Sequence, residues 1–177
     1  MVKPKATLKY PAAGVIVTAA VIKGRVRFFH VVEGRWNGAA AAKMYAELAK
    51  AMRRAFPEHA AKPRAKWLVM EDNDPTGYKS SAAEGKKTEL SINVLRLPPR
   101  SPDLNVLDYY VWSAINKRLR EQEAKFPANK KESKEAYLKR LRATDLGLPP
   151  SEVKDAMRSM RRRLRQIVDT GGYLIDG

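Results

Sequence analysis

Hydrophobic patterning in the first third of the chain predicts two strands followed by a helix. Residues 14–22 are rich in Val and Ile and apolar on both alternating faces, as in an interior strand that helices cover on both sides. After the turn signal Lys23-Gly24, residues 25–32 alternate less regularly and favour a sheet-edge strand antiparallel to the first. From Asn37, apolar residues recur at helical spacing until Pro57. We expect a hairpin and then a long helix.

Two further strands and several helices follow in the pattern. The strands are expected at residues 67–70 and 93–97, with a helix at 79–90 between them. Another helix begins at Asn105, which can cap it, and runs to about Gln122. The last helix follows a cap at 149–151 and ends at the glycine pair 171–172. This order of strands and helices is α/β in character.

Length and charge suggest one domain with a basic surface. We expect a single domain over residues 1–177, with a core at about 10–122 and a basic helical extension at about 123–177. Residues 117–142 hold ten basic and four acidic side chains and predict a solvated, partly helical surface. The formal net charge is 35 minus 19, or +16, which favours a polyanionic partner such as nucleic acid.

Composition also excludes several classes of protein and site. No stretch reaches the roughly 20 apolar residues that span a bilayer, so we expect no membrane association by a spanning helix. Lysines near the start, followed by apolar residues 12–22, imitate a signal peptide, but the hairpin explains them better and no signal peptide is expected. With no Cys and two His, disulfides and thiolate metal sites are excluded. Any metal must be held by carboxylates.

Two aspartates carry the candidate chemistry. Asp72 directly follows a short apolar strand, and Asp108 opens a helix after the proline-rich segment 97–105. Carboxylates on rigid elements within a basic protein suit a hard divalent cation and phosphodiester chemistry. The structural alternatives are a loop-capping turn for Asp72 and an ordinary first-turn acid for Asp108.

Neighbouring acids and polar residues have other expected roles. Asp74 is expected to be a turn residue and Asp103 part of the loop, while strand alternation turns Glu71 away from Asp72. Arg100, Ser101 and Asn105 position either a phosphate or the loop backbone, and we leave these alternatives open. Core packing is the favoured role of Trp112 over stacking on a base.

The segments Leu68-Val-Met-Glu-Asp-Asn-Asp-Pro75 and Leu97-Pro-Pro-Arg-Ser-Pro-Asp-Leu-Asn105 resemble the DDE catalytic domain of mariner-superfamily transposases. Asp72 and Asp108 match two of that family's acids, with 35 residues between them. The resemblance covers about residues 10–121. It implies an RNase H-like mixed sheet flanked by helices, a pair of Mg²⁺ or Mn²⁺ ions, and DNA hydrolysis with strand transfer at transposon ends. On this resemblance Asp72 and Asp108 are the catalytic, metal-binding residues.

Three departures limit what the resemblance implies. Thr76-Gly77-Tyr78 stands where the family often has a His, and the acid at 108 is Asp, with Val106 where Pro is common in the Glu-bearing branch. Most important, the family's first aspartate lies on a strand upstream of the hairpin, and no Asp precedes Asp72 here. We therefore expect a chain that lacks the first catalytic strand and the DNA-binding module. It should bind metal weakly and cleave little or no DNA alone.

The missing strand would also divide the sheet. The family's strand order is third, second, first, fourth, fifth, so the absent strand is central and its gap would separate the hairpin from the Asp72 strand. Three outcomes are open: the halves close on each other, residues 6–10 partly fill the gap, or exposed strand edges invite aggregation and pairing with a partner.

Basic residues predict the contacts with DNA. Those expected to bind the backbone are Arg100, Lys117, Arg118, Arg158, Arg161, Arg162 and Arg165. A plain solvated face or a nuclear import patch is the alternative for the arginines of residues 158–165. The sequence thus predicts a transposase-derived domain that binds DNA. In a eukaryote it is expected in the nucleus, and a homodimer is one possible assembly. The alternatives are a non-catalytic nucleic-acid-binding remnant and a pseudogene product.

Overall fold

The first two strands form the hairpin that the hydrophobic pattern predicts. The computed structural model describes residues 14–127 and 132–172. Strand β1 (Ile16–Ile22) pairs antiparallel with β2 (Arg25–Val32), with an irregularity in register between Ala20 and Val21. Lys23 and Gly24 have φ angles of 53° and 68°, the left-handed values that a two-residue hairpin turn requires. The turn therefore fixes the register of the pair.

A helix and a parallel strand pair follow the hairpin. Helix α1 (Gly38–Ala55) is capped by Asn37, whose side chain accepts a 3.0 Å hydrogen bond from the Ala40 amide, and the single turn α2 (Pro57–Ala60) follows it. Strand β3 (Trp67–Glu71), helix α3 (Ser81–Glu89) and strand β4 (Ile92–Arg96) form a unit in which the two strands are parallel. The crossover through α3 is the usual way to join parallel strands.

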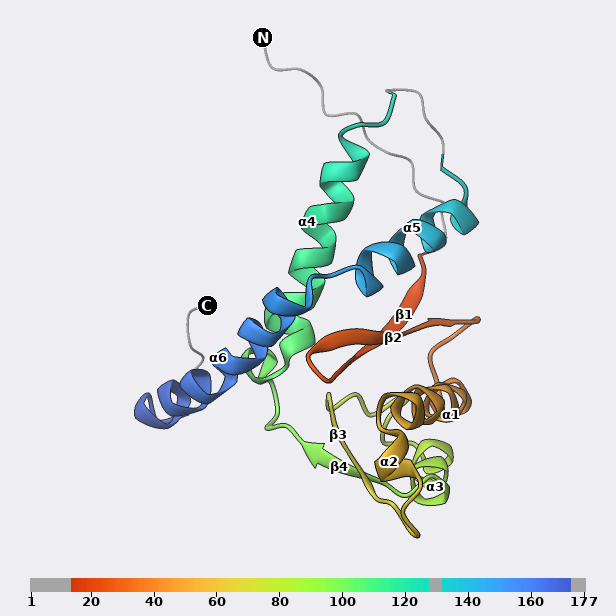
Figure 1. The fold of residues 1–177 in the computed structure, drawn as a ribbon, viewed down its shortest axis with the longest axis vertical. Helices are drawn as coiled ribbons and strands as arrows, with labels where there is room; N and C mark the ends of the chain where they lie inside the picture. Colours follow the sequence, from red (N-terminus) through yellow and green to blue (C-terminus); the bar gives the residue numbers. More distant parts are fainter. Residues whose placement is uncertain (1–13, 128–131, 173–177) are drawn as a thin grey trace.

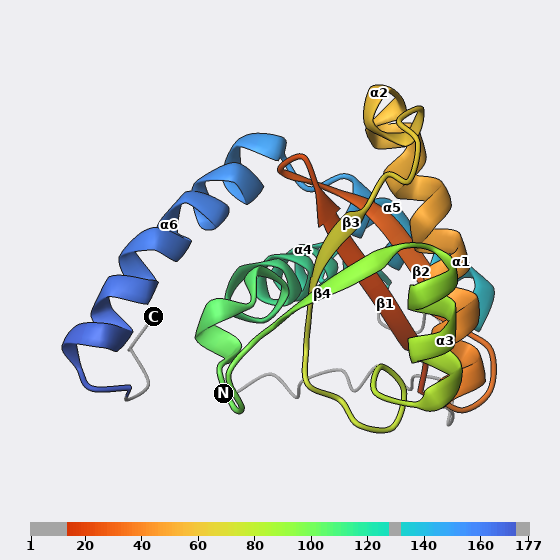
Figure 2. The ribbon, with the colours of Figure 1, turned by 90° about the horizontal axis from the view of Figure 1, so that it is seen from below.

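The remainder of the described chain is helical. It comprises η1 (Pro102–Leu104), the π-helical turn η2 (Leu107–Val111), α4 (Trp112–Glu123), α5 (Lys134–Leu146) and α6 (Pro150–Asp169). Helices α5 and α6 both pack on β2, and α6 also contacts η1 and η2. Figures 1 and 2 show α6 along the outside of the molecule, with its C-terminal half extending away from the strands.

The described strands form two sheets rather than one. Strand β1 is bonded to β2 and β3 to β4, and no ladder joins the pairs among the described residues. Separate cores lie on the two sides: one packs α1 against Ile22, Phe28 and Trp67, the other packs α4, α5 and α6 against Val26 and Phe29. The expected gap between the hairpin and the Asp72 strand is therefore present. Residues 6–10, one candidate to fill it, lie outside the described residues.

Most expected elements are confirmed, with small differences at their ends. The predicted order of strands and helices holds, and the fold is the mixed α/β class that was expected. The turn α2 and the π-helical turn η2 were not anticipated. Pro149 occupies the N-cap of α6 without a side-chain hydrogen bond, because proline has no polar side chain to supply one. In the described ranges, none of the helices combines the length and apolarity needed to cross a bilayer.

One carboxylate in the second core is buried without compensation. Asp145, near the end of α5, is 0% exposed, and neither carboxylate oxygen has a hydrogen-bond partner among the described residues. Burial raises the pKa of this carboxyl to about 7. Because the folded chain binds this proton more tightly than the unfolded chain does, protonation of Asp145 adds to the free energy of unfolding. That contribution is fully present below the ordinary pKa of Asp and is lost as pH rises towards 7.

We predict that Asp145→Asn removes this pH dependence. The wild-type free energy of unfolding should fall by about 1 kcal/mol per pH unit between pH 4 and 7 through this group, and the neutral amide should flatten that slope. Urea unfolding, followed by tryptophan fluorescence at several pH values, measures it. Asp169→Asn, at an exposed position on α6, should leave the slope unchanged. Equal slopes in Asp145→Asn and the wild type would contradict the assignment.

Candidate active site

The end of β3 places Asp72 at the gap between the strand pairs. Asp72 is the residue after β3, and its Oδ1 accepts a 2.6 Å hydrogen bond from the Asp74 amide. The Asn73 side chain donates to the carbonyl of Leu97 at 2.6 Å, which ties this turn to the segment that follows β4. The turn thus holds one carboxylate oxygen of Asp72 and leaves the second for other contacts.

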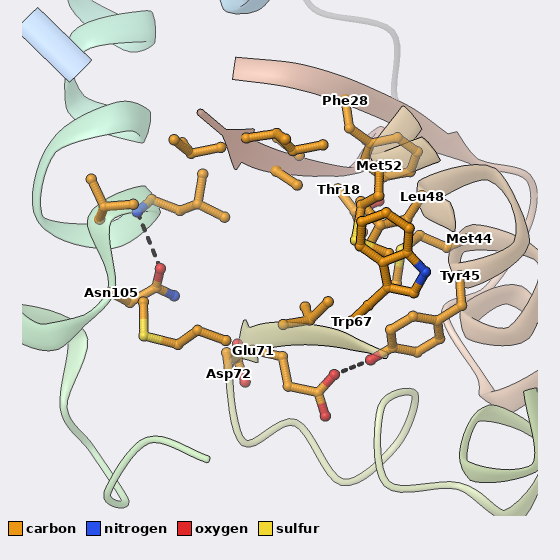
Figure 3. Close-up of a pocket in the computed structure, with 18 of the residues that line it drawn as sticks. Thr18, Phe28, Met44, Tyr45, Leu48, Met52, Trp67, Glu71, Asp72 and Asn105 are labelled. Carbon is orange, nitrogen blue, oxygen red and sulfur yellow. Dashed lines mark hydrogen bonds between the residues drawn. The ribbon is translucent and has the colours of Figure 1, made fainter. Parts of the chain in front are cut away.

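Glu71 anchors the strand end on the opposite face. Its carboxylate accepts hydrogen bonds from the Tyr45 hydroxyl and from the Lys87 ammonium, the latter at 2.9 Å. Lys87 is 2% exposed and also donates to the Tyr78 carbonyl and to Glu84. Burial and the bond to Glu71 raise the pKa of Tyr45 far above its usual range. Figure 3 shows Glu71 directed towards Tyr45, so the expectation that Glu71 turns away from Asp72 is confirmed.

Asp74 organises the loop that follows. Its Oδ2 accepts hydrogen bonds from Trp36 Nε1 at 2.6 Å and from the Gly77 amide at 2.8 Å. Burial would raise the pKa of Asp74, but the hydrogen bonds from Trp36, Gly77 and Thr76 outweigh it and hold the pKa below its ordinary value. A Cβ at Gly77 would lie 2.2 Å from Cε2 of Trp36, so no residue larger than glycine fits at position 77 while the indole keeps its place. The expected turn role of Asp74 is confirmed.

Asp108 lies in the π-helical turn η2. The Asn105 side chain donates a 2.7 Å hydrogen bond to Asp108 Oδ2 and accepts one of 3.1 Å from the Leu107 amide. Asn105 therefore caps the start of the helix, as expected, and fixes the carboxylate one turn later. The Trp112 amide donates to the carbonyl of Leu107, five residues earlier, which is the bond that defines the wider turn.

The two aspartates act on each other electrostatically. Partial burial raises the pKa of Asp108, and the negative charge of Asp72 raises it further, while Asn105 opposes both. Tyr78 responds to the same charges: burial raises its pKa most, followed by the charge of Asp72. Both aspartates line one cavity of about 970 Å³ between β1 and β3. Figure 3 shows Asp72 and Asn105 at the end of this cavity where β3 faces the η2 helix.

The donor set suits a hard cation but is small. Asp72 and Asp108 offer carboxylate oxygens, the ligand type that Mg²⁺ and Mn²⁺ prefer. No group of three or more acidic or imidazole side chains with metal-binding geometry occurs in residues 14–127 and 132–172. Two carboxylates without a third leave half of the charge on a pair of divalent ions uncompensated. The geometry therefore fits one weakly held ion better than two.

The basic residues expected to contact DNA differ in availability. Helix α6 is held beside η2 by a 2.7 Å hydrogen bond from the Tyr109 hydroxyl to the carbonyl of Ala156. Arg118 binds Glu152 through two 2.8 Å contacts, so its guanidinium joins α4 to α6. Arg158 forms an exposed pair with Asp155 at 2.9 Å. The exposed expected DNA contacts with no ion pair in the described residues are Arg100, Lys117, Arg161, Arg162 and Arg165.

Trp112 and Asp103 have the structural settings that the sequence favoured. Trp112 packs against the second hydrophobic core and lines the cavity. Asp103 is buried within η1. The roles of Lys87 and Tyr78 were missed because a lone Lys in a polar helix and a Tyr in a loop carry no periodic signal. The partners of Lys87, which are Glu71, Glu84 and the Tyr78 carbonyl, come together only in the folded chain.

Comparison with known proteins gives one sequence relative and several solved structures. No protein-family model matches the chain. The Tcb1 transposase of Caenorhabditis briggsae is 30% identical over 107 residues, which are 60% of this chain and 36% of that protein. The chain thus spans about a third of the length of this relative.

The solved structures establish the fold. The Mos1 mariner transposase catalytic domain superposes with a TM-score of 0.76 at 18% identity, covering 92% of this chain and 76% of that one. The Mos1 paired-end complex with Mn gives 0.77 at 18% identity, over 99% of this chain and 51% of that one. The chain is therefore similar in sequence to part of the Tcb1 transposase and has the RNase H-like fold of the Mos1 mariner transposase catalytic domain.

Proposed function

We propose that this chain is a transposase-derived DNA-binding domain in which Asp72 and Asp108 are the metal-binding, catalytic carboxylates of a phosphodiester-cleavage and strand-transfer site. The observation that carries the proposal is the electrostatic coupling of these two aspartates at one end of the cavity, beside a basic helix. A cation between Asp72 and Asp108 would offset the negative charge of Asp72 that raises the pKa of Asp108. Mg²⁺ or Mn²⁺ bound there would activate the attacking oxygen and stabilise the leaving one.

The surrounding residues support that assignment by orienting the carboxylates. Asn105 and the Asp74 amide each hold one oxygen of Asp108 and Asp72, respectively, so neither side chain must be ordered when an ion arrives. Structures of the Mos1 catalytic domain are described with Mg and with Mn, which supports the choice of ion. With two carboxylates, the site should hold metal weakly and cleave little or no DNA without a further acid.

A second function, non-catalytic binding of nucleic acid, is favoured by a specific observation. The described residues bring no third acid to Asp72 and Asp108, while exposed arginines remain on α6. Binding to phosphates requires those cations and no metal. This alternative predicts DNA binding that is unaffected by loss of both aspartates.

The expected partner is DNA. The net charge of +16 and the Mos1 transpososome and paired-end structures support this assignment. A DNA-binding role would place a eukaryotic protein of this kind in the nucleus. Homodimer formation belongs to the same proposal, and sedimentation with and without DNA measures it.

We predict that Asp72→Asn and Asp108→Asn each weaken Mn²⁺ binding by at least about tenfold. The loss of a direct ligand should exceed the ~10–100-fold effect of removing an orienting partner. Electron paramagnetic resonance of free Mn²⁺ during titration measures the affinity. Asp155→Asn, an exposed acid on α6, is the matched control and should bind as the wild type does. If all three variants matched the wild type, the metal site would be refuted.

For DNA we predict that the double variant Arg161→Ala, Arg165→Ala lowers affinity and flattens the salt dependence. Two lost phosphate contacts should reduce the slope of log affinity against log salt by about 1.8. Fluorescence anisotropy of a labelled duplex over a salt series measures it. The control, Arg53→Ala with Arg54→Ala, removes two exposed charges at the end of α1. An equal loss of slope in both double variants would argue for a diffuse charge effect instead of an α6 interface.

A further inference from the structure

The cavity between the strand pairs has two strand edges as its walls. It is lined by every residue of 15–23 and of 66–72, which include all of β1 and β3. In the described chain, β1 is bonded on one side to β2, and β3 on one side to β4. The second edges of β1 and β3 therefore face the cavity without strand partners. Unpaired amide and carbonyl groups along such edges are a template for another strand.

The side chains along these edges are apolar and incompletely covered. Ile16 is 42% exposed, Leu68 69% and Met70 38%, and all three line the cavity. The hydroxyl of Thr18, in the middle of β1, is buried and has no hydrogen-bond partner in the described ranges. Apolar and polar groups of β1 and β3 are thus both left unsatisfied along the same slot.

Two different hydrophobic faces close the slot above and below. Met44, Leu48 and Met52 of α1 line one face. Leu107, Trp112 and Met157 from η2, α4 and α6 line the other. Because successive side chains of a strand point to opposite faces, one strand in the slot would contribute to both cores and join them.

We propose that the slot between β1 and β3 binds an extended strand of a second polypeptide, about seven residues long to match β1 and apolar on both faces. A helix or a small apolar molecule satisfies neither row of unpaired backbone groups, whereas one strand can bond to both edges. A second copy of this chain is disfavoured, because its described strands are already paired within their sheets. The proposal concerns strand binding and stands whether or not the aspartates bind metal.

The first experiment titrates the full chain with a fluorescent peptide of the core sequence Val-Ile-Val-Phe-Val-Ile-Val, flanked by lysines for solubility. Its control is the same peptide N-methylated at alternate residues, which keeps every side chain and removes main-chain donors. We expect saturable binding of the first peptide and at least tenfold weaker binding of the second. Hydrogen exchange should show new protection of the β1 and β3 amides. Equal binding of both peptides would overturn the proposal in favour of an apolar cavity.

Substitutions then locate the binding. Leu68→Arg puts a charge on an exposed position that lines the slot, and it should weaken the peptide by tenfold or more. Leu95→Arg is the matched control, because Leu95 is 51% exposed on the neighbouring strand β4 and lies outside the slot. Equal weakening by both would overturn the proposal, and normal urea unfolding of each variant shows that it is folded.

Other occupants give distinct results. Binding that appears only after deletion of residues 1–13 would assign the slot to the chain's own N-terminal segment and overturn the proposal. Self-association that Leu68→Arg abolishes, with no peptide binding, would assign it to a second copy, with the same consequence. Titration with Mn²⁺ separates the two proposals: peptide binding by a chain whose Mn²⁺ affinity is unchanged by Asp72→Asn and Asp108→Asn supports the strand site and counts against the metal site alone.

Discussion

The buried Lys87–Glu71 ion pair is the interaction on which the site depends. Lys87 links β3 to α3, and Tyr45 links the same carboxylate to α1, so the end of β3 is fixed by two helices. Replacing one member would leave a buried charge without its counter-ion, which costs far more than an exposed pair contributes. Since strand residues alternate, anchoring Glu71 on one face directs Asp72 to the other, where Asp108 lies.

The same anchoring explains why the molecule can hold a divided sheet. Each strand pair is fastened to its own helices: β3 and β4 to α1 and α3, and β2 to α5 and α6. Helix α1 also packs on the hairpin, and side chains from the two faces of β1 contribute to both cores. The helices therefore keep the two pairs in place, although no backbone hydrogen bonds connect them in the described ranges. The cost is a row of incompletely covered apolar side chains along the slot.

Much of the fold could be predicted from the sequence because its elements have strong local signals. The alternating run 14–22, the turn at Lys23 and the helical spacing after Asn37 all gave the correct element. The proximity of Asp72 and Asp108 came from family resemblance, since no local pattern brings residues 36 apart together. Lys87 and Asp145 could not be predicted, because their burial is decided by tertiary packing against a sequence signal that favours exposure.

The π-helical turn at Leu107–Val111 separates two requirements that a regular helix would couple. In an α-helix each residue adds a fixed rotation, so the direction of Asp108 would dictate which residues of α4 face the core. A wider turn accommodates one additional residue and breaks this relation. Ala114, Ile115 and Leu119 can remain buried while the acid is aimed independently. Insertion or loss of a single residue in this turn can thus change the direction of the carboxylate while the buried face of α4 keeps its packing.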